Sequence, residues 1–158
     1  MVDKAVLKNI PLFKTLDNKE LEVMAKIIKE ETYPSEEIIF SENMQGNRLF
    51  IIKKGTVKIS KTLREGERQN LNILKENEFF GECSFIDSRP HSATAETIKN
   101  TELFIIEKSD FDKLEETNPM CGYKVIRTLT LTINGILRQM DEKFIDMVKY
   151  VWEYGSKS

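Results

Sequence analysis

The chain has 158 residues, with 24 basic and 26 acidic side chains and a formal net charge of −2. This length suits one domain with a real core and leaves too few residues for a second independent domain. The balanced charge excludes an overall field that would attract nucleic acid or an acidic membrane surface. No stretch resembles a signal peptide or a membrane span, so we expect a cytoplasmic location and no membrane partner.

The first predicted element is a short amphipathic helix from about Asn18 to Lys29. Asp17 and Glu20 have the spacing of a capping box, and Leu16 and Leu21 are placed as a hydrophobic staple. Apolar residues then recur at helical spacing on one face. We expect residues 1–31 to form an N-terminal helical part.

Residues 32–108 change to short runs that are rich in Ile, Val, Phe and Thr and alternate with a period of two. Turn signals separate the runs at 43–47, Lys54-Gly55, Glu65-Gly66-Glu67 and Lys99-Asn100. Short strands at such even spacing favour an antiparallel sandwich or barrel. The fold class is therefore mainly β with flanking helices.

Residues 79–97, with the sequence FFGECSFIDSRPHSATAET, interrupt this β pattern and have the outline of an anion-binding loop. Gly81 permits close backbone approach, and the next residues predict one short helical turn whose free N–H groups would face a phosphate. Glu82 is a carboxylate suited to holding a sugar hydroxyl. The segment is the main candidate for a ligand site.

The last part, residues 109–152, predicts two helices. Ser109 is placed to cap a short helix, and Asn118-Pro119 supplies an N-cap and a first-turn proline for a long one. The long helix carries an apolar stripe at steps of three and four: Ile126, Leu129, Ile133, Ile136, Met140, Phe144, Met147 and Val151.

We interpret this stripe as the seam of a homodimer, with Ile126, Leu129, Ile133 and Met140 in the dimer helix. The alternative is a helix folded back on its own sheet. The tail after Trp152 is too short for a helix-turn-helix unit, so we expect no DNA binding.

The two cysteines, Cys83 and Cys121, are far apart in sequence and accompanied by a single histidine. This pattern favours neither a zinc site nor a disulfide framework, and we expect reduced thiols, no metal and no cofactor. The lone histidine has no recognisable nucleophile or metal partner, so we expect no enzyme activity. A redox sensor at Cys83 stays an alternative, although no resolving cysteine lies near it in sequence.

Phe80-Gly81-Glu82, followed by Pro90-x-Ser-Ala-Thr, resembles the phosphate-binding cassette of cyclic nucleotide-binding domains. The resemblance extends to Pro11-Leu12-Phe13, residues 37–40 and residues 49–57, and so covers nearly the whole chain. It implies a single domain over residues 1–158, a double-stranded β-helix (jelly roll) and cyclic AMP or cyclic GMP as ligand. Two family glycines are replaced by Asn43 and Asn77, and asparagine is the residue that best tolerates positive φ after glycine.

The resemblance also implies roles for individual residues. Gly81 and Glu82 would grip the ribose 2′-hydroxyl, and the N–H groups of Cys83 and Ser84 would face the cyclic phosphate. The hydroxyl of Ser92 would also bind the cyclic phosphate. Ile59 and Leu71 would line the pocket wall. The helical lid over the base would consist of Thr132, Ile136 and Leu137.

His91 stands where the family has an arginine that pairs with the phosphate. Neutral imidazole offers one hydrogen bond in place of a charged bidentate grip, so we expect affinity weaker by roughly tenfold to a hundredfold. A cationic His91 at the phosphate would make affinity rise from about pH 8 to pH 6. The opposite interpretation is an exposed loop histidine in a pocket that binds nothing.

These observations favour a non-catalytic regulatory module, joined as a homodimer, in which nucleotide occupancy moves the long C-terminal helix and signals to a downstream protein that the sequence does not identify. The alternative is a degenerate member of this fold that binds no cyclic nucleotide and acts as a dimeric scaffold.

Overall fold

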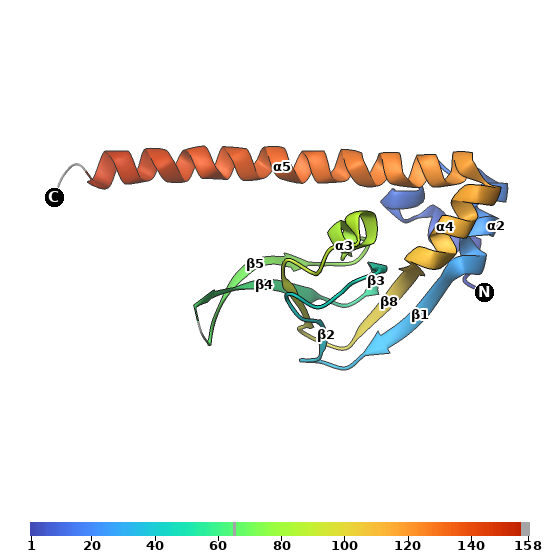
Figure 1. The fold of residues 1–158 in the computed structure, drawn as a ribbon, viewed down its shortest axis with the longest axis horizontal. Helices are drawn as coiled ribbons and strands as arrows, with labels where there is room; N and C mark the ends of the chain where they lie inside the picture. The colour runs from blue at the N-terminus through green and yellow to red at the C-terminus, as the bar shows by residue number, and fades with distance from the viewer. Residues whose placement is uncertain (65, 156–158) are drawn as a thin grey trace.

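A β-roll with helices gathered at one end makes up the structure, and one long helix lies across it (Figure 1). The structure is a computed structural model that describes residues 1–64 and 66–155. Glu65, which belongs to one predicted turn, and the last three residues of the predicted 1–158 domain lie outside the described residues.

The N-terminal end holds α1 (Lys4–Lys8), the 3-10 helix η1 (Pro11–Phe13) and α2 (Asn18–Ile27). Asp17 and Glu20 form the predicted capping box: each side chain accepts a hydrogen bond from the backbone N–H of the other. α1 was not predicted, because its five residues are too few to show a periodic apolar pattern.

The helical part ends earlier than predicted. Ile28 and Lys29 already belong to β1, where they pair with Ile106 and Ile105 of β8. The roll therefore begins at residue 28 rather than 32. Periodicity alone cannot place this boundary, because β-branched residues such as Ile27 and Ile28 fit the apolar face of a helix and the inner face of a strand.

The strands form two four-stranded antiparallel sheets in the described part of the chain, with orders β1-β8-β3-β6 and β2-β7-β4-β5. This arrangement confirms the predicted jelly roll with flanking helices. Their bounds are β1 Ile28–Tyr33, β2 Ile38–Phe40, β3 Arg48–Lys54, β4 Val57–Arg64, β5 Glu67–Leu74, β6 Phe79–Phe80, β7 Thr94–Thr97 and β8 Thr101–Glu107.

Asn43 and Asn77, which replace glycines of the resembled family, both adopt a positive φ of 70°. Asn43 lies in the loop between β2 and β3, and Asn77 lies in the loop between β5 and β6. Asparagine tolerates this left-handed region better than other non-glycine residues, so the fold keeps these turns as expected.

Two hydrophobic clusters fill the structure. One lies inside the roll and includes the stacked rings of Phe50 and Phe80, whose centroids are 5.0 Å apart. The other joins the N-terminal helices to the roll and to the C-terminal helices, through residues such as Leu21, Ile51 and Leu129. The second cluster holds the first part of the long C-terminal helix against the domain.

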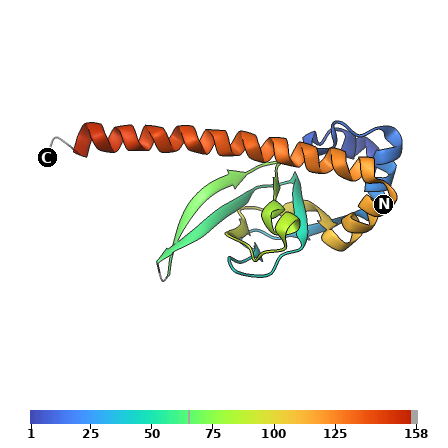
Figure 2. The same ribbon diagram turned by 45° about the horizontal axis from the view of Figure 1, so that its top comes forward.

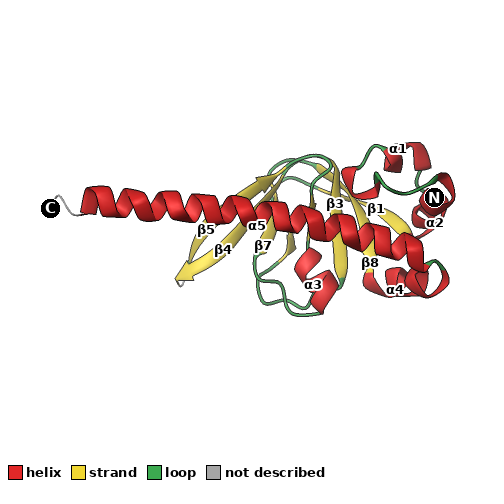
Figure 3. Cartoon of the chain, turned by 90° about the horizontal axis from the view of Figure 1, so that it is seen from above, coloured by secondary structure: helices red, strands yellow, loops and turns green. Residues whose placement is uncertain are grey.

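The chain ends in α4 (Lys108–Thr117) and the 37-residue α5 (Pro119–Gly155), about 55 Å long at 1.5 Å per residue. Glu107, rather than the predicted Ser109, is the N-cap of α4. Pro119 begins α5, as its fixed φ and missing N–H predict. Figures 2 and 3 show α5 crossing over the roll and projecting beyond the β4–β5 hairpin. Neither α5 nor any other described helix combines the length and the hydropathy that crossing a membrane requires.

Candidate ligand-binding site

Residues 79–97, which we call the cassette, connect the two sheets of the roll: β6 belongs to one sheet, α3 (Glu82–Asp87) and a loop follow, and β7 belongs to the other. Gly81 precedes α3 in the left-handed conformation, with φ 77°. A Cβ at this position would lie 2.9 Å from the Arg48 carbonyl oxygen and 3.0 Å from the Phe50 ring. Glycine is therefore required here both for its backbone angle and for space.

The predicted helical turn is present as α3, and Phe85 fixes it to the domain. Phe85 is buried against Phe111, with ring centroids 5.4 Å apart, and its N–H donates to the Gly81 carbonyl. The N–H groups before it, including those of Cys83 and Ser84, belong to the first turn and have no intrahelical acceptor. They keep the capacity to bind a ligand oxygen, which is the role that the sequence predicted.

Glu82 is half-buried at the start of α3, and burial raises the pKa of its carboxyl group. Its side chain accepts a weak hydrogen bond from Cys83 Sγ at 3.7 Å. Desolvation, with the nearby Glu82 charge, raises the pKa of the Cys83 thiol as well. A raised pKa lowers the thiolate fraction, so the local chemistry does not favour Cys83 as a reactive redox sensor.

His91 is packed inside the roll, at 6% exposure, and is not the exposed loop histidine of one interpretation. Its ring stacks on Phe40, with centroids 3.6 Å apart and planes 7° from parallel. Its Nδ1 lies 3.1 Å from Ser84 Oγ. Burial lowers the pKa of His91, so the neutral form is favoured and a cationic His91 at neutral pH is not supported.

The other edge of the His91 ring faces Gly46. A Cβ on Gly46 would lie 2.3 Å from His91 Nε2, so only glycine leaves room for the ring. The backbone pairs here too: the His91 N–H donates to Met44 and the Asn43 N–H donates to the His91 carbonyl. Phe40 and Gly46 could not be predicted as neighbours of His91 from the sequence, because they are close to His91 only in the fold.

Two polar side chains in the loop between α3 and β7 are exposed. Ser92 is exposed, so its hydroxyl is accessible to a ligand. Arg89, two residues before His91, is 84% exposed and its Nε lies 3.9 Å from Asp87. Arg89 directly precedes Pro90, and among the described residues its charged group pairs only with Asp87, at the end of α3.

The two predicted wall residues differ in burial. Ile59 on β4 packs against the cluster inside the roll, whereas Leu71 on β5 is 57% exposed and lies at a bulge in the β4–β5 pairing. Next to Ile59, Ser60 is 1% exposed, and its Oγ has no hydrogen-bond partner among the described residues. Nothing in the sequence pattern distinguished this serine from a strand residue on the solvent side.

The predicted lid residues Thr132, Ile136 and Leu137 are all exposed on α5. The Thr132 hydroxyl donates to the Thr128 carbonyl within the helix. Their role over a bound base stays a prediction.

The predicted seam divides into two parts. Leu129 is 0% exposed within its own chain, and Ile126 and Ile133 pack against the same cluster, so Leu129 cannot lie in an intermolecular seam. The alternative of a helix packed on its own domain is correct for this half. From Ile136 onward the stripe is exposed, at Ile136, Met140, Phe144, Met147 and Val151.

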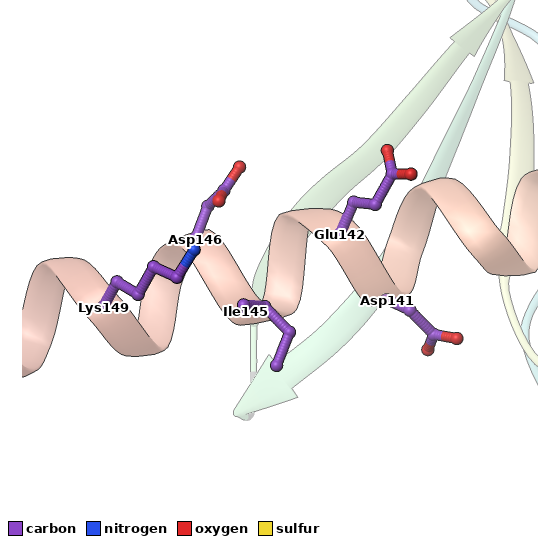
Figure 4. Close-up of a pocket in the computed structure, with 5 residues that line it drawn as sticks. All are labelled: Asp141, Glu142, Ile145, Asp146 and Lys149. Carbon is purple, nitrogen blue, oxygen red and sulfur yellow. The ribbon is translucent and has the colours of Figure 1, made fainter.

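A shallow depression lies on the exposed half of α5, lined by Asp141, Glu142, Ile145, Asp146 and Lys149 (Figure 4). All five residues come from one helix and no second element closes the space. We therefore assign it no ligand.

No group of three metal-ligating side chains occurs among the described residues. Cys121 is buried at the start of α5, and burial raises its pKa to about 11. Such a thiol is inert, which fits the interpretation of Cys121 as a packed small residue.

Comparison with known proteins identifies the same region. The family described as "Cyclic nucleotide-binding domain" matches residues 30–118. The chain is 28% identical over 135 residues to the cyclic AMP receptor protein of Thermus thermophilus, covering 85% of this chain and 62% of that protein. It is 30% identical over 121 residues to the cGMP-dependent protein kinase of Plasmodium berghei, covering 76% of this chain and 13% of the kinase.

Among solved structures, a cyclic nucleotide-binding domain from Methylobacillus flagellatus has a TM-score of 0.81 at 21% identity, covering 90% of this chain and 80% of that chain. At this identity the likeness shows the fold alone. The chain spans less than two thirds of the length of both curated relatives.

Proposed function

The chain belongs to the cyclic nucleotide-binding domain family, and on this premise we propose that it is a non-catalytic regulatory module that binds cyclic AMP or cyclic GMP in the cassette. One observation carries the proposal: a left-handed Gly81 leads directly into Glu82 and the free first-turn N–H groups of α3. A carboxylate binds a sugar hydroxyl, and free N–H groups at the start of a helix bind a phosphate oxygen.

The names of the relatives support a regulatory role and leave the base open. One relative is a cyclic AMP receptor and the other a cGMP-dependent kinase. The apolar lid positions Ile136 and Leu137 would pack on either purine without reading its edge, so we propose weak discrimination between the two bases.

We propose that α5 transmits occupancy. Its first half is fixed to the domain through Leu129 and Val125, whereas the lid positions beyond them are exposed. A base that packs against Ile136 would favour one position of the free half of α5, and this difference in contact is what shifts a conformational equilibrium.

We further propose that a second copy of the chain covers the exposed half of the α5 stripe. The apolar residues from Met140 to Val151 recur at steps of three and four along a helix that projects beyond the roll, which is the pattern of a two-stranded coiled coil. Such a homodimer would present its helices to a downstream protein.

The second candidate function is a dimeric scaffold with an empty cassette. It is favoured by the packing of His91, whose ring is turned into the domain and leaves the cassette without the phosphate-pairing cation that the family resemblance implies.

Calorimetric titration with cyclic AMP and cyclic GMP tests the proposal. We expect saturable binding by the natural sequence and binding at least tenfold tighter in His91→Arg, because a charged hydrogen bond of about 1.5–3 kcal/mol is added. Thr15→Arg, which adds the same charge in an exposed loop outside the cassette, serves as the matched control and should leave affinity unchanged. Absence of binding by both the natural chain and His91→Arg, with each folded by circular dichroism, would support the scaffold.

A further inference from the structure

The cassette is almost devoid of positive charge. Among residues 79–97 the sequence contains a single arginine, no lysine and a single histidine. Arg89 extends into solvent at 84% exposure, toward Asp87. A phosphate placed on the first turn of α3 would therefore find no cationic side chain extending toward it from the cassette itself.

Two cations on elements that contact the cassette are already paired with acids. Arg48, whose carbonyl contacts the Gly81 turn, donates from Nε to Glu107 at 2.9 Å. Lys108 lies over the Phe85 ring, and its Nζ pairs with Asp112 at 2.8 Å. Moving either side chain to a ligand would break an existing ion pair.

His91 does not replace them. The groups that face its ring are the Phe40 ring, the Ser84 hydroxyl and Gly46, and none of these is an acid that would favour the cation. Both ring edges are occupied, by Ser84 at Nδ1 and by Gly46 at Nε2. Burial lowers the pKa of the imidazole as well, so the ring is neutral and enclosed.

Glu82 makes the imbalance larger. It is half-buried, and no described Lys or Arg forms a salt bridge with it. A cyclic phosphate bound beside it would add a second negative charge in a partly desolvated space, where like charges repel more strongly than in water. The uncharged hydroxyls of a sugar carry no such penalty and can donate to the Glu82 carboxylate.

We propose that the cassette recognises the nucleoside part of its ligand, so that uncharged adenosine or guanosine binds at least as tightly as the corresponding cyclic nucleotide. This inference rests on the proposed function, since it concerns the same pocket. It specifies that the hydrogen bonds from the first-turn N–H groups to the phosphate are offset by the repulsion from Glu82, so the phosphate adds no net affinity in the natural chain. It also identifies the purine nucleoside as a second class of ligand.

The test is a set of four calorimetric titrations of the natural chain, with adenosine, cyclic AMP, guanosine and cyclic GMP at one pH and ionic strength. We expect the Kd of each nucleoside to be no higher than that of its cyclic nucleotide, to within a tolerance of about threefold. Nucleosides that bind tenfold or more weakly than the cyclic nucleotides would overturn the inference and leave the proposed function intact. Absence of binding by all four would overturn the proposed function itself.

A variant provides an independent arm. In His91→Arg the affinity for cyclic AMP should rise at least tenfold while the affinity for adenosine changes less than threefold, because only the cyclic nucleotide has a phosphate to pair with the new charge. Equal gains for both ligands would contradict the inference, since they would mean that the arginine acts on the pocket and not on the phosphate. If this variant does not fold, the four titrations of the natural chain decide alone.

Discussion

Acidification from about pH 7 to pH 5 should destabilise the folded chain through its single histidine. His91 is 6% exposed and stacked on Phe40, and burial holds the pKa of its imidazole below the ordinary value of 6.5. The unfolded chain, in which the ring is solvated, therefore binds a proton first as pH falls. The stability that the neutral ring contributes is fully present above pH 6.5 and is lost as pH falls below that value.

The size of the effect has an upper limit. One group changes the free energy of unfolding by at most about 1.4 kcal/mol per pH unit, so the loss between pH 6.5 and about pH 5 is at most about 2 kcal/mol. Glu82 acts in the opposite sense, because a raised carboxyl pKa means that the folded chain binds its proton first. A variant without histidine separates the two.

We would measure urea unfolding by circular dichroism at fixed protein concentration from pH 7.5 to 5, for the natural chain and for His91→Gln. Glutamine preserves a polar planar group but does not titrate, and the variant contains no histidine at all. The difference between the two unfolding free energies should shrink as pH falls. Parallel curves over this range would refute the assignment of His91 as a buried neutral ring.

Three further predictions concern other parts of the molecule. Gly46→Ala should destabilise the fold by about 1–3 kcal/mol in urea unfolding, because its Cβ would overlap the His91 ring, while the control Gly135→Ala, with no heavy atom within 4 Å, should be neutral or stabilising. Glu82→Gln should weaken adenosine binding about tenfold in calorimetry and cyclic AMP binding less, because the lost hydrogen bond is partly offset by lost repulsion; the reverse order would contradict this. Phe144→Glu should convert a dimer to single 18.4 kDa chains in light scattering, with Glu142→Ala on the other side of α5 as control, and an unchanged mass would exclude this seam.

Local signals in the sequence were sufficient for much of the fold. The capping box at Asp17 depends on two residues three apart, and the positive φ of Asn43 and Asn77 depends on one residue each, so both are visible without tertiary contacts. The alternation of apolar and polar residues likewise favoured an antiparallel sandwich or barrel, and the family resemblance implied the jelly roll.

The structure differs from the predictions where burial of a residue depends on residues that are distant in sequence. His91 is buried because Phe40 offers a stacking surface and Gly46 leaves space, and both are far from it in sequence. Leu129 and Met140 occupy equivalent places in one apolar stripe, yet only Leu129 is buried by the domain. Periodicity identifies an apolar face but does not specify what covers it.

The most direct test of the central claim, that the cassette is the ligand site, is a titration of ¹⁵N-labelled protein with cyclic AMP followed by amide chemical shifts. We predict that the largest shifts occur at Gly81, Glu82, Cys83 and Ser84, with a second set at Ser92, and that they saturate together. Saturating shifts confined to the exposed half of α5, or no shifts at millimolar ligand, would contradict the account.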